Sequence, residues 1–125
     1  MSPTGRPLRV VLQCRDEREV ATCEHIAFAF ARDAGLRGVE VWFAAACATM
    51  LAEHVAARGG GDVELSVVDW PRPALELRAS DEGPPLDGYT AELHAARRYA
   101  SELRVAWHAS VGSLVTARLW LLEPS

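Results

Sequence analysis

The sequence predicts one α/β domain of three layers, in which helices cover both faces of a mostly parallel sheet of four or five strands. Residues 8–58 read as strand, helix, strand and helix, and two strands joined by a helix form a βαβ unit, whose strands run parallel. The first strand has a continuous apolar run, which is typical of a strand covered on both faces. A chain of 125 residues fits a single domain, residues 1–125, with one core.

The first strand and the first helix are predicted at residues 8–13 and 17–34. Acidic side chains around Glu17 favour the start of a helix because they interact with the positive end of its dipole, and Gly35 ends the helix. Residues 1–7 are expected to be a short disordered lead. The apolar residues of the helix recur at spacings of three and four: Val20, Cys23, Ala27, Phe30, Ala31 and Ala34.

A second strand, a second helix and a third strand are predicted at residues 39–43, 45–58 and 63–68. Residues 39–43 are Val-Glu-Val-Trp-Phe, and β-branched and aromatic residues are enriched in strands. The helix ends at a run of three glycines. Polar and apolar residues alternate at the start of the third strand, which indicates a place nearer the edge of the sheet.

The region from residue 71 to residue 88 is predicted to be a long loop, because it carries four prolines. A connection of this length inside a compact domain is usually either functional or mobile. Residues 75–77 can add a short extended piece to it.

The final helix is predicted to begin near Tyr89, with Asp87 or Thr90 as its cap. Its end is ambiguous, since residues 104–108 also read as a strand that leads through a hairpin turn into residues 114–122. Continuation of the apolar stripe favours a helix to about Ala109 and one closing strand at residues 115–122. The stripe consists of Tyr89, Leu93, Ala96, Ala100, Leu103 and Trp107.

Composition excludes several classes of function. Half of the residues are hydrophobic and 24% are charged, as in soluble globular proteins. The net charge of -4 provides no basic field for a phosphate backbone, so a nucleic-acid partner is not expected. No apolar run reaches the roughly 20 residues that cross a bilayer, and the first residues lack the apolar core of a signal peptide, which predicts a cytoplasmic protein without membrane contact.

No cofactor and no metal are predicted. The first strand is followed by neither a glycine-rich dinucleotide fingerprint nor a phosphate loop. All thirteen basic residues are arginine, which excludes a Schiff-base lysine or a lysine general base. A zinc site drawn from Cys14, Cys23 and His25 would have spacings of nine and two, which match no structural zinc motif.

Cys14 and Cys47 are the candidate catalytic residues, because each falls at or just after the end of a predicted strand. A helix N-terminus and nearby arginines would favour the Cys14 thiolate, whereas Asp16 and Glu19 crowd the same turn and disfavour an anion. For Cys47 the alternative is the buried first turn of a helix. Three cysteines are an odd number, so free thiols are expected, and Cys23 is interpreted as a core residue.

Asp69, Trp70 and His108 are the candidate ligand-binding residues. Asp69 and Trp70 follow the third predicted strand, although an aspartate before a Trp-Pro turn is more often a turn cap. The position of His108 depends on where the final helix ends. His54 lies two helical turns after Cys47, about 10 Å away, so the two cannot form a nucleophile and base pair.

Residues 27–35, residues 39–43 and the pair Met50-Leu51 resemble the DsrE-like sulfur-relay family, in which an alanine-rich helix ends in glycine and is followed by a valine-rich strand and a helix with a leucine pair. The resemblance covers residues 8–55. It implies a small α/β domain that assembles into trimers or hexamers, and in the sulfur-carrying members a persulfide on a cysteine after about the third strand. Here residues 68–71 contain no thiol, so the persulfide role cannot be assigned.

Two hypotheses follow. In the first, a cytoplasmic DsrE-like protein binds a small ligand or handles sulfur through Cys14 or Cys47, with residues 71–88 as the cover of the site. In the second, the protein is a non-catalytic homo-oligomeric subunit or protein-interaction module. An enzyme that uses Asp69 and His108 is a third possibility. Thiols that converge on an open cleft would favour the first hypothesis, and buried thiols would favour the second.

Overall fold

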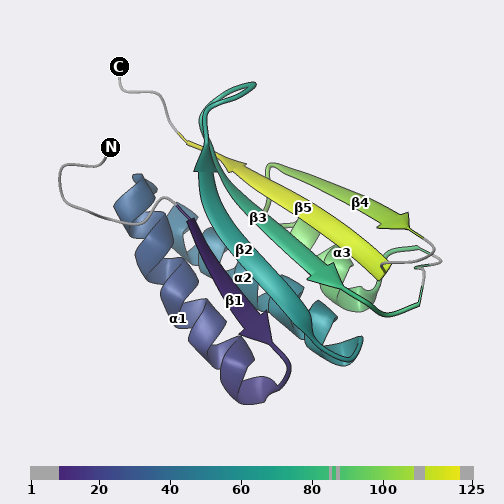
Figure 1. Cartoon of the computed structure of the whole chain (residues 1–125). Helices are drawn as coiled ribbons and strands as arrows, with labels where there is room; N and C mark the ends of the chain where they lie inside the picture. Colours follow the sequence, from purple (N-terminus) through teal and green to yellow (C-terminus); the bar gives the residue numbers. More distant parts are fainter. Residues whose placement is uncertain (1–8, 85, 87, 109–111, 122–125) are drawn as a thin grey trace.

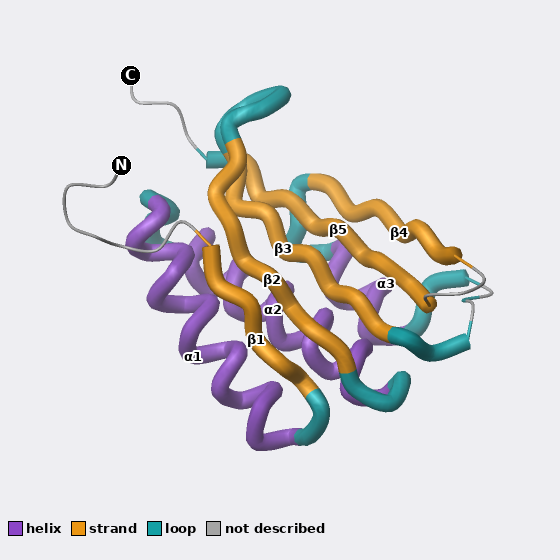
Figure 2. The backbone as a smooth tube through the Cα atoms, viewed as in Figure 1, coloured by secondary structure: helices purple, strands orange, loops and turns teal. Residues whose placement is uncertain are grey.

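A computed structural model describes residues 9–84, 86, 88–108 and 112–121. It has two layers, a five-stranded sheet with the order β1-β2-β3-β5-β4 and helices on one face of that sheet (Figure 1). The other face of the sheet is open (Figure 2). In chain order the elements are β1 (Arg9–Cys14), α1 (Glu17–Ala34), α2 (Val39–Ala57), β2 (Gly61–Val68), β3 (Ala74–Asp81), α3 (Ala91–Arg97), β4 (Glu102–His108) and β5 (Gly112–Trp120).

The prediction of a mostly parallel sheet between two helical layers is wrong, because every pair of neighbouring strands is antiparallel. The error arises at residues 39–43, which form the first turn of α2 and not a strand. Two helices therefore lie between β1 and β2, and no βαβ unit exists there. Val41, Ala44 and Ala48 are buried at helical spacings, which shows why this segment packs as a helix.

Helix α2 lies between α1 and α3 in the helical layer, and it contacts both of these helices and the sheet. Apolar residues occupy nearly all of its sides, so it has no polar stripe that would have marked it as a helix in the sequence. In length and composition it is the one helix of the described chain that could cross a membrane, with a mean hydropathy of 1.3. Half of that stretch is buried within the fold.

The prediction of α1 is confirmed. The Asp16 side chain accepts a hydrogen bond from the Glu19 backbone N–H at 2.9 Å and caps the helix. Gly35 ends it with a left-handed φ of 111°, a conformation that few other residues adopt. Cys23 and Ala27 of the predicted apolar stripe are fully buried against the sheet and α2.

Residues 71–88 are not one long loop, because residues 74–81 form β3 in the middle of the sheet. Two of the four prolines that suggested a loop come before Ala74 and the other two come after Asp81, so none lies within the strand. The short extended piece that was expected at residues 75–77 is part of this eight-residue strand. Glu76 and Arg78 face the open side of the sheet, while Leu77 between them faces the helices, so the strand alternates as expected for a half-open sheet.

The end of the chain follows the alternative reading. Helix α3 ends at Arg97, and the hairpin of β4 and β5 follows it. The preferred prediction, a helix to about Ala109 and a single closing strand, is therefore wrong for the residues that are described. Leu103 fits the helical stripe and, together with Val105, also faces the core in β4, so the local pattern was compatible with both structures. The predicted lead, residues 1–7, lies outside the described residues.

Candidate functional site

The thiols do not converge on an open cleft. Cys14, Cys23 and Cys47 are all free and fully buried. Burial raises the pKa of Cys47 to about 12. A hydrogen bond from the Cys23 thiol lowers the pKa of Cys14, and burial and the negative charges of Glu19 and Asp62 oppose this effect. The buried neighbour of the Cys14 thiol is thus another thiol.

The other predicted site residues are separated by the length of the sheet. Asp69 and Trp70 lie in the turn between β2 and β3, which projects beyond the strands, and Trp70 is 81% exposed (Figure 2). His108 ends β4 opposite Gly112, at the other end of the sheet, and its side chain lies outside the described part of the structure. An eight-residue strand spans about 23 Å, so Asp69 and His108 do not share a site.

The end of the sheet that carries Cys14 holds a buried polar cluster that the sequence did not predict. In register across the strands lie Cys14, Gly61, Asp81 and Ser113. The Asp81 carboxylate, which is fully buried, accepts hydrogen bonds from Arg58 Nε at 2.9 Å, from Ser113 Oγ at 2.5 Å and from the Gly83 backbone N–H at 2.8 Å.

Burial would raise the pKa of Asp81, but the hydrogen bonds from Ser113, Arg58 and Gly83 and the charge of Arg58 hold it below its usual value. Asp81 is therefore a carboxylate at neutral pH. Arg58 follows the last turn of α2 and also donates a hydrogen bond to the backbone oxygen of Pro84, so it ties α2 to the segment after β3.

Glycines allow the strands to approach closely beside Asp81. A Cβ atom at Gly61 would overlap the backbone oxygen of Ser80, and one at Gly112 would overlap the backbone oxygen of Asp81. Gly112 also has a positive φ of 80°. The backbones of β2 and β5 can enclose the Asp81 end of β3 because neither has a side chain at these points.

His54, on α2, is the second titratable side chain of the cluster and is 1% exposed. Its Nδ1 lies 3.2 Å from Thr90 Oγ1, and its Nε2 lies 3.8 Å from Asp81 Oδ2 and has no hydrogen-bond partner. Burial lowers the pKa of His54, because it disfavours the charged ring, and the positive charge of Arg58 lowers it further. The negative charges of Asp81 and Glu92 raise the pKa, but the net effect is a decrease. The ring is therefore neutral at pH 7, despite the nearby carboxylate.

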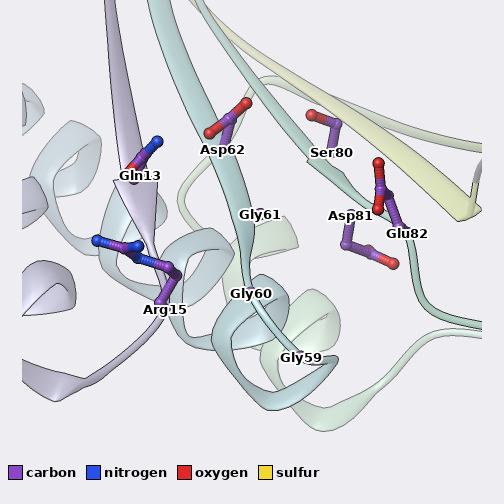
Figure 3. A pocket seen from close by; sticks show the side chains of 9 residues that line it. All are labelled: Gln13, Arg15, Gly59, Gly60, Gly61, Asp62, Ser80, Asp81 and Glu82. Carbon is purple, nitrogen blue, oxygen red and sulfur yellow. The ribbon is translucent and has the colours of Figure 1, made fainter.

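An open hollow of about 380 Å³ adjoins this cluster, where β1 and β3 end and the turn before β2 passes between them (Figure 3). Arg15 lies on one side of it, Glu82 lies on the other, and Asp62 lies between them on β2. Arg15 is paired with Glu19 at 3.0 Å, so the carboxylates dominate the charge of the hollow. The lining residues are Gln13, Arg15, Gly59, Gly60, Gly61, Asp62, Ser80, Asp81 and Glu82.

The chemistry available in the hollow is limited. It is lined by neither a cysteine nor a histidine. Among the described residues, no group of three or more His, Cys, Asp or Glu side chains could hold a metal ion. The hollow can bind a polar group, but it contains no nucleophile and base in contact.

Apolar side chains gather on the outer side of the helices. Val39 is 59% exposed, Trp42 64% and Phe43 38%. The Trp42 ring makes an edge contact with Phe28 of α1 at 4.8 Å between centroids, and Phe43 packs against Tyr99 at 5.7 Å. We call these five residues the aromatic surface; it joins α1, α2 and the segment after α3. The sequence shows Val39, Trp42 and Phe43 as a cluster of large apolar residues, but the prediction of a buried strand at this position concealed their exposure on a helix.

Neither a family model nor a curated protein matches this sequence. The resemblance to the DsrE-like family depended in part on a valine-rich strand at residues 39–43, which are helical here, and the sheet is antiparallel. The fold therefore gives no support to the sulfur chemistry or to the trimers and hexamers that the resemblance implied.

Proposed function

We propose that the protein is a non-catalytic protein-interaction module and that the aromatic surface is its contact surface. The observation that carries the proposal is the exposure of Val39, Trp42 and Phe43 on one helix, side by side with Phe28 and Tyr99. Aromatic residues are enriched at protein interfaces, and contiguous exposed apolar patches mark interaction sites. Trp42 is the expected centre of the contact, because tryptophan is among the residues that contribute most to binding.

The buried thiols support a module without thiol chemistry. A reactive cysteine needs access to its substrate and a thiolate, and Cys47 has neither. Cys14 has a lowered pKa but no exposed surface. Sulfur handling through either residue is therefore the weaker of the two hypotheses.

The test is site-specific photo-crosslinking in cells, with a photoreactive phenylalanine analogue in place of Trp42. We expect one discrete adduct. The control carries the same analogue in place of Arg78, which is exposed on the open face of the sheet, and should give none. An adduct with the mass of two chains would establish the predicted homo-oligomer, and another mass would establish a different partner. Equal labelling at both positions, or no adduct at position 42, would contradict the proposal.

A second candidate function is the binding of a small polar molecule in the hollow of Figure 3. The volume of about 380 Å³ lies in the range of small-molecule sites, and Asp62 and Glu82 favour a cationic amine. A bound ligand raises the melting temperature, since it stabilises the folded state only. Thermal shift with a panel of small amines should show this increase in the native protein and not in the Asp62→Asn variant. A melting temperature unchanged by every amine would exclude this candidate.

A further inference from the structure

A groove runs along the outer side of the helical layer between α1 and α2. It consists of two adjoining hollows of about 370 and 540 Å³, which share Glu24. The Glu24 side chain accepts a hydrogen bond from Thr49 Oγ1 at 3.0 Å and so links the two helices. The lining residues are Glu17, Val20, Ala21, Glu24, His25 and Phe28 from α1, and Trp42, Ala45, Ala46, Thr49, Glu53 and Ala56 from α2.

The groove has an apolar end and an acidic end. Phe28 and Trp42 lie near the turn that joins the two helices, and Glu17 lies at the other end. Eleven residues separate Phe28 from Glu17, which corresponds to about 17 Å, or three turns of a helix. On α1 the spacing from Phe28 to Glu24 is four residues and from Glu24 to Glu17 seven, so these three side chains lie on one helical face.

The acidic end has no compensating cation. Glu17, Glu24 and Glu53 are exposed, and none forms an ion pair with a described residue. No arginine lines the groove, and His25 lies at the apolar end. Three carboxylates in one groove attract a cationic partner, and the attraction weakens as salt screens it.

We propose, on the basis of the proposed function, that this groove binds a basic amphipathic helix of a partner protein. An apolar side chain of that helix packs on Phe28 and Trp42, and its lysine or arginine side chains face the three glutamates. Alanines along the groove allow the backbone of the partner to approach closely. This is recognition of a helix in a groove, in which anchors recur at spacings of three and four residues over about three turns.

The probe for the test is a fluorescein-labelled synthetic helix of 15 residues with two leucines at one end and three arginines along the same face. We expect saturable binding to the full chain, measured by fluorescence anisotropy, and weaker binding at high salt. A peptide of the same composition with scrambled spacing and a peptide with glutamates in place of the arginines are the controls, and neither should bind.

The triple variant Glu17→Gln, Glu24→Gln and Glu53→Gln should bind the basic helix about tenfold more weakly, since exposed ion pairs contribute little individually and add over three contacts. Trp42→Ala should also bind it more weakly. Asp69→Asn, a change at an exposed residue outside the groove, should bind it as the native protein does. Circular dichroism of each variant shows whether its fold is intact.

Unchanged affinity in the triple variant, or equal binding of the acidic peptide, would overturn the proposal. If the analogue at position 42 nevertheless crosslinks to a partner in cells, the proposed function as an interaction module stands, and only a basic helix is excluded as the occupant of the groove. If the basic helix binds in solution but the analogue at position 42 gives no adduct in cells, the groove can bind such a helix, but the proposed function fails.

Discussion

The Asp81 carboxylate shows how a charge is kept inside this fold. Arg58 supplies the opposite charge, and the Ser113 hydroxyl and the Gly83 backbone N–H satisfy other acceptor positions. Such a cluster is sensitive to the loss of a single member, because the remaining charge stays buried without a partner.

Asp81→Asn should lower the free energy of unfolding by about 3 kcal/mol, since removal of one partner leaves Arg58 largely buried and unpaired. Chemical denaturation at pH 7 measures this change. The matched control is Glu64→Gln, whose pair with Arg9 is exposed, and it should cost less than about 1 kcal/mol. Equal losses in the two variants would contradict the structural role of the cluster.

The contribution of Asp81 should depend on pH in a defined direction. Its pKa in the folded protein lies below the unfolded value of about 3.9. The stabilisation is therefore present above about pH 4 and is lost as the pH falls through the folded pKa.

His54 should make the protein less stable in mild acid. Its pKa in the folded state lies below the unfolded value of about 6.5, so the unfolded chain binds more protons as the pH falls below that value. The stabilisation is present above about pH 7 and decreases by up to about 1.4 kcal/mol per pH unit below 6.5. Denaturation of the native protein at pH 7.5, 6.5 and 5.5 measures this loss.

Two variants show whether the effect belongs to His54. In His54→Gln the dependence between pH 7.5 and 5.5 should be much smaller than in the native protein. In His25→Gln, a change at an exposed histidine of α1, the dependence should remain. A native protein with the same stability at all three pH values would disprove the buried neutral state of His54.

At the scale of elements, α1 and α2 differ in how the sequence signals them. Helix α1 has an amphipathic pattern, an N-terminal cap and a terminal glycine, and each of these is a local feature. Helix α2 begins after Gly38 without a side-chain cap, and its first residues have high strand propensity. Packing of α2 against the sheet and against its two neighbouring helices, not local preference, makes residues 39–43 helical.

The cap of α1 has a testable contribution. Asp16→Ala should destabilise the protein by about 1 kcal/mol, because the backbone N–H of Glu19 loses its acceptor. Asp16→Ser should retain most of the stability, since serine also caps helices. Thermal denaturation of the two variants measures the difference. Equal stabilities would show that water replaces the cap at no cost.

At the scale of the whole molecule, the core is shared by one sheet face and all of the helices. Cys14, Cys23 and Cys47 come from β1, α1 and α2 and are buried in the same core cluster. The reactivity of the three thiols therefore reports on the opening of the entire fold.

Native protein treated with an alkylating reagent at pH 7 should show no rapid modification of any of the three cysteines, and all three should react in denaturant. Mass spectrometry at timed intervals assigns each site. Rapid labelling of Cys14 alone would indicate local opening at the end of β1 and would restore the thiol hypothesis. Rapid labelling of Cys47 would mean that α2 does not remain packed in solution.

The polar cluster could not be predicted from the sequence because its members lie far apart along the chain. His54, Arg58, Asp81, Thr90 and Ser113 come together only when β3 takes the centre of the sheet and β5 pairs beside it. The thiols were assigned to strand ends from local pattern. That placement is correct for Cys14. Cys47 lies in a helix, as predicted, but no strand precedes it, because that helix begins at Val39.

Local signals in the sequence were sufficient for the bounds of α1, for the strand at β1 and for Cys23 as a core residue, because caps, glycines and periodicity act over a few residues. Tertiary structure decided whether residues 39–43, 74–81 and 104–108 became helix, strand or loop. Each is a short segment whose apolar residues fit more than one structure, and strand pairing and helix packing with distant parts of the chain select between them. The antiparallel sheet, the buried Asp81 cluster and the exposed aromatic surface all follow from that selection.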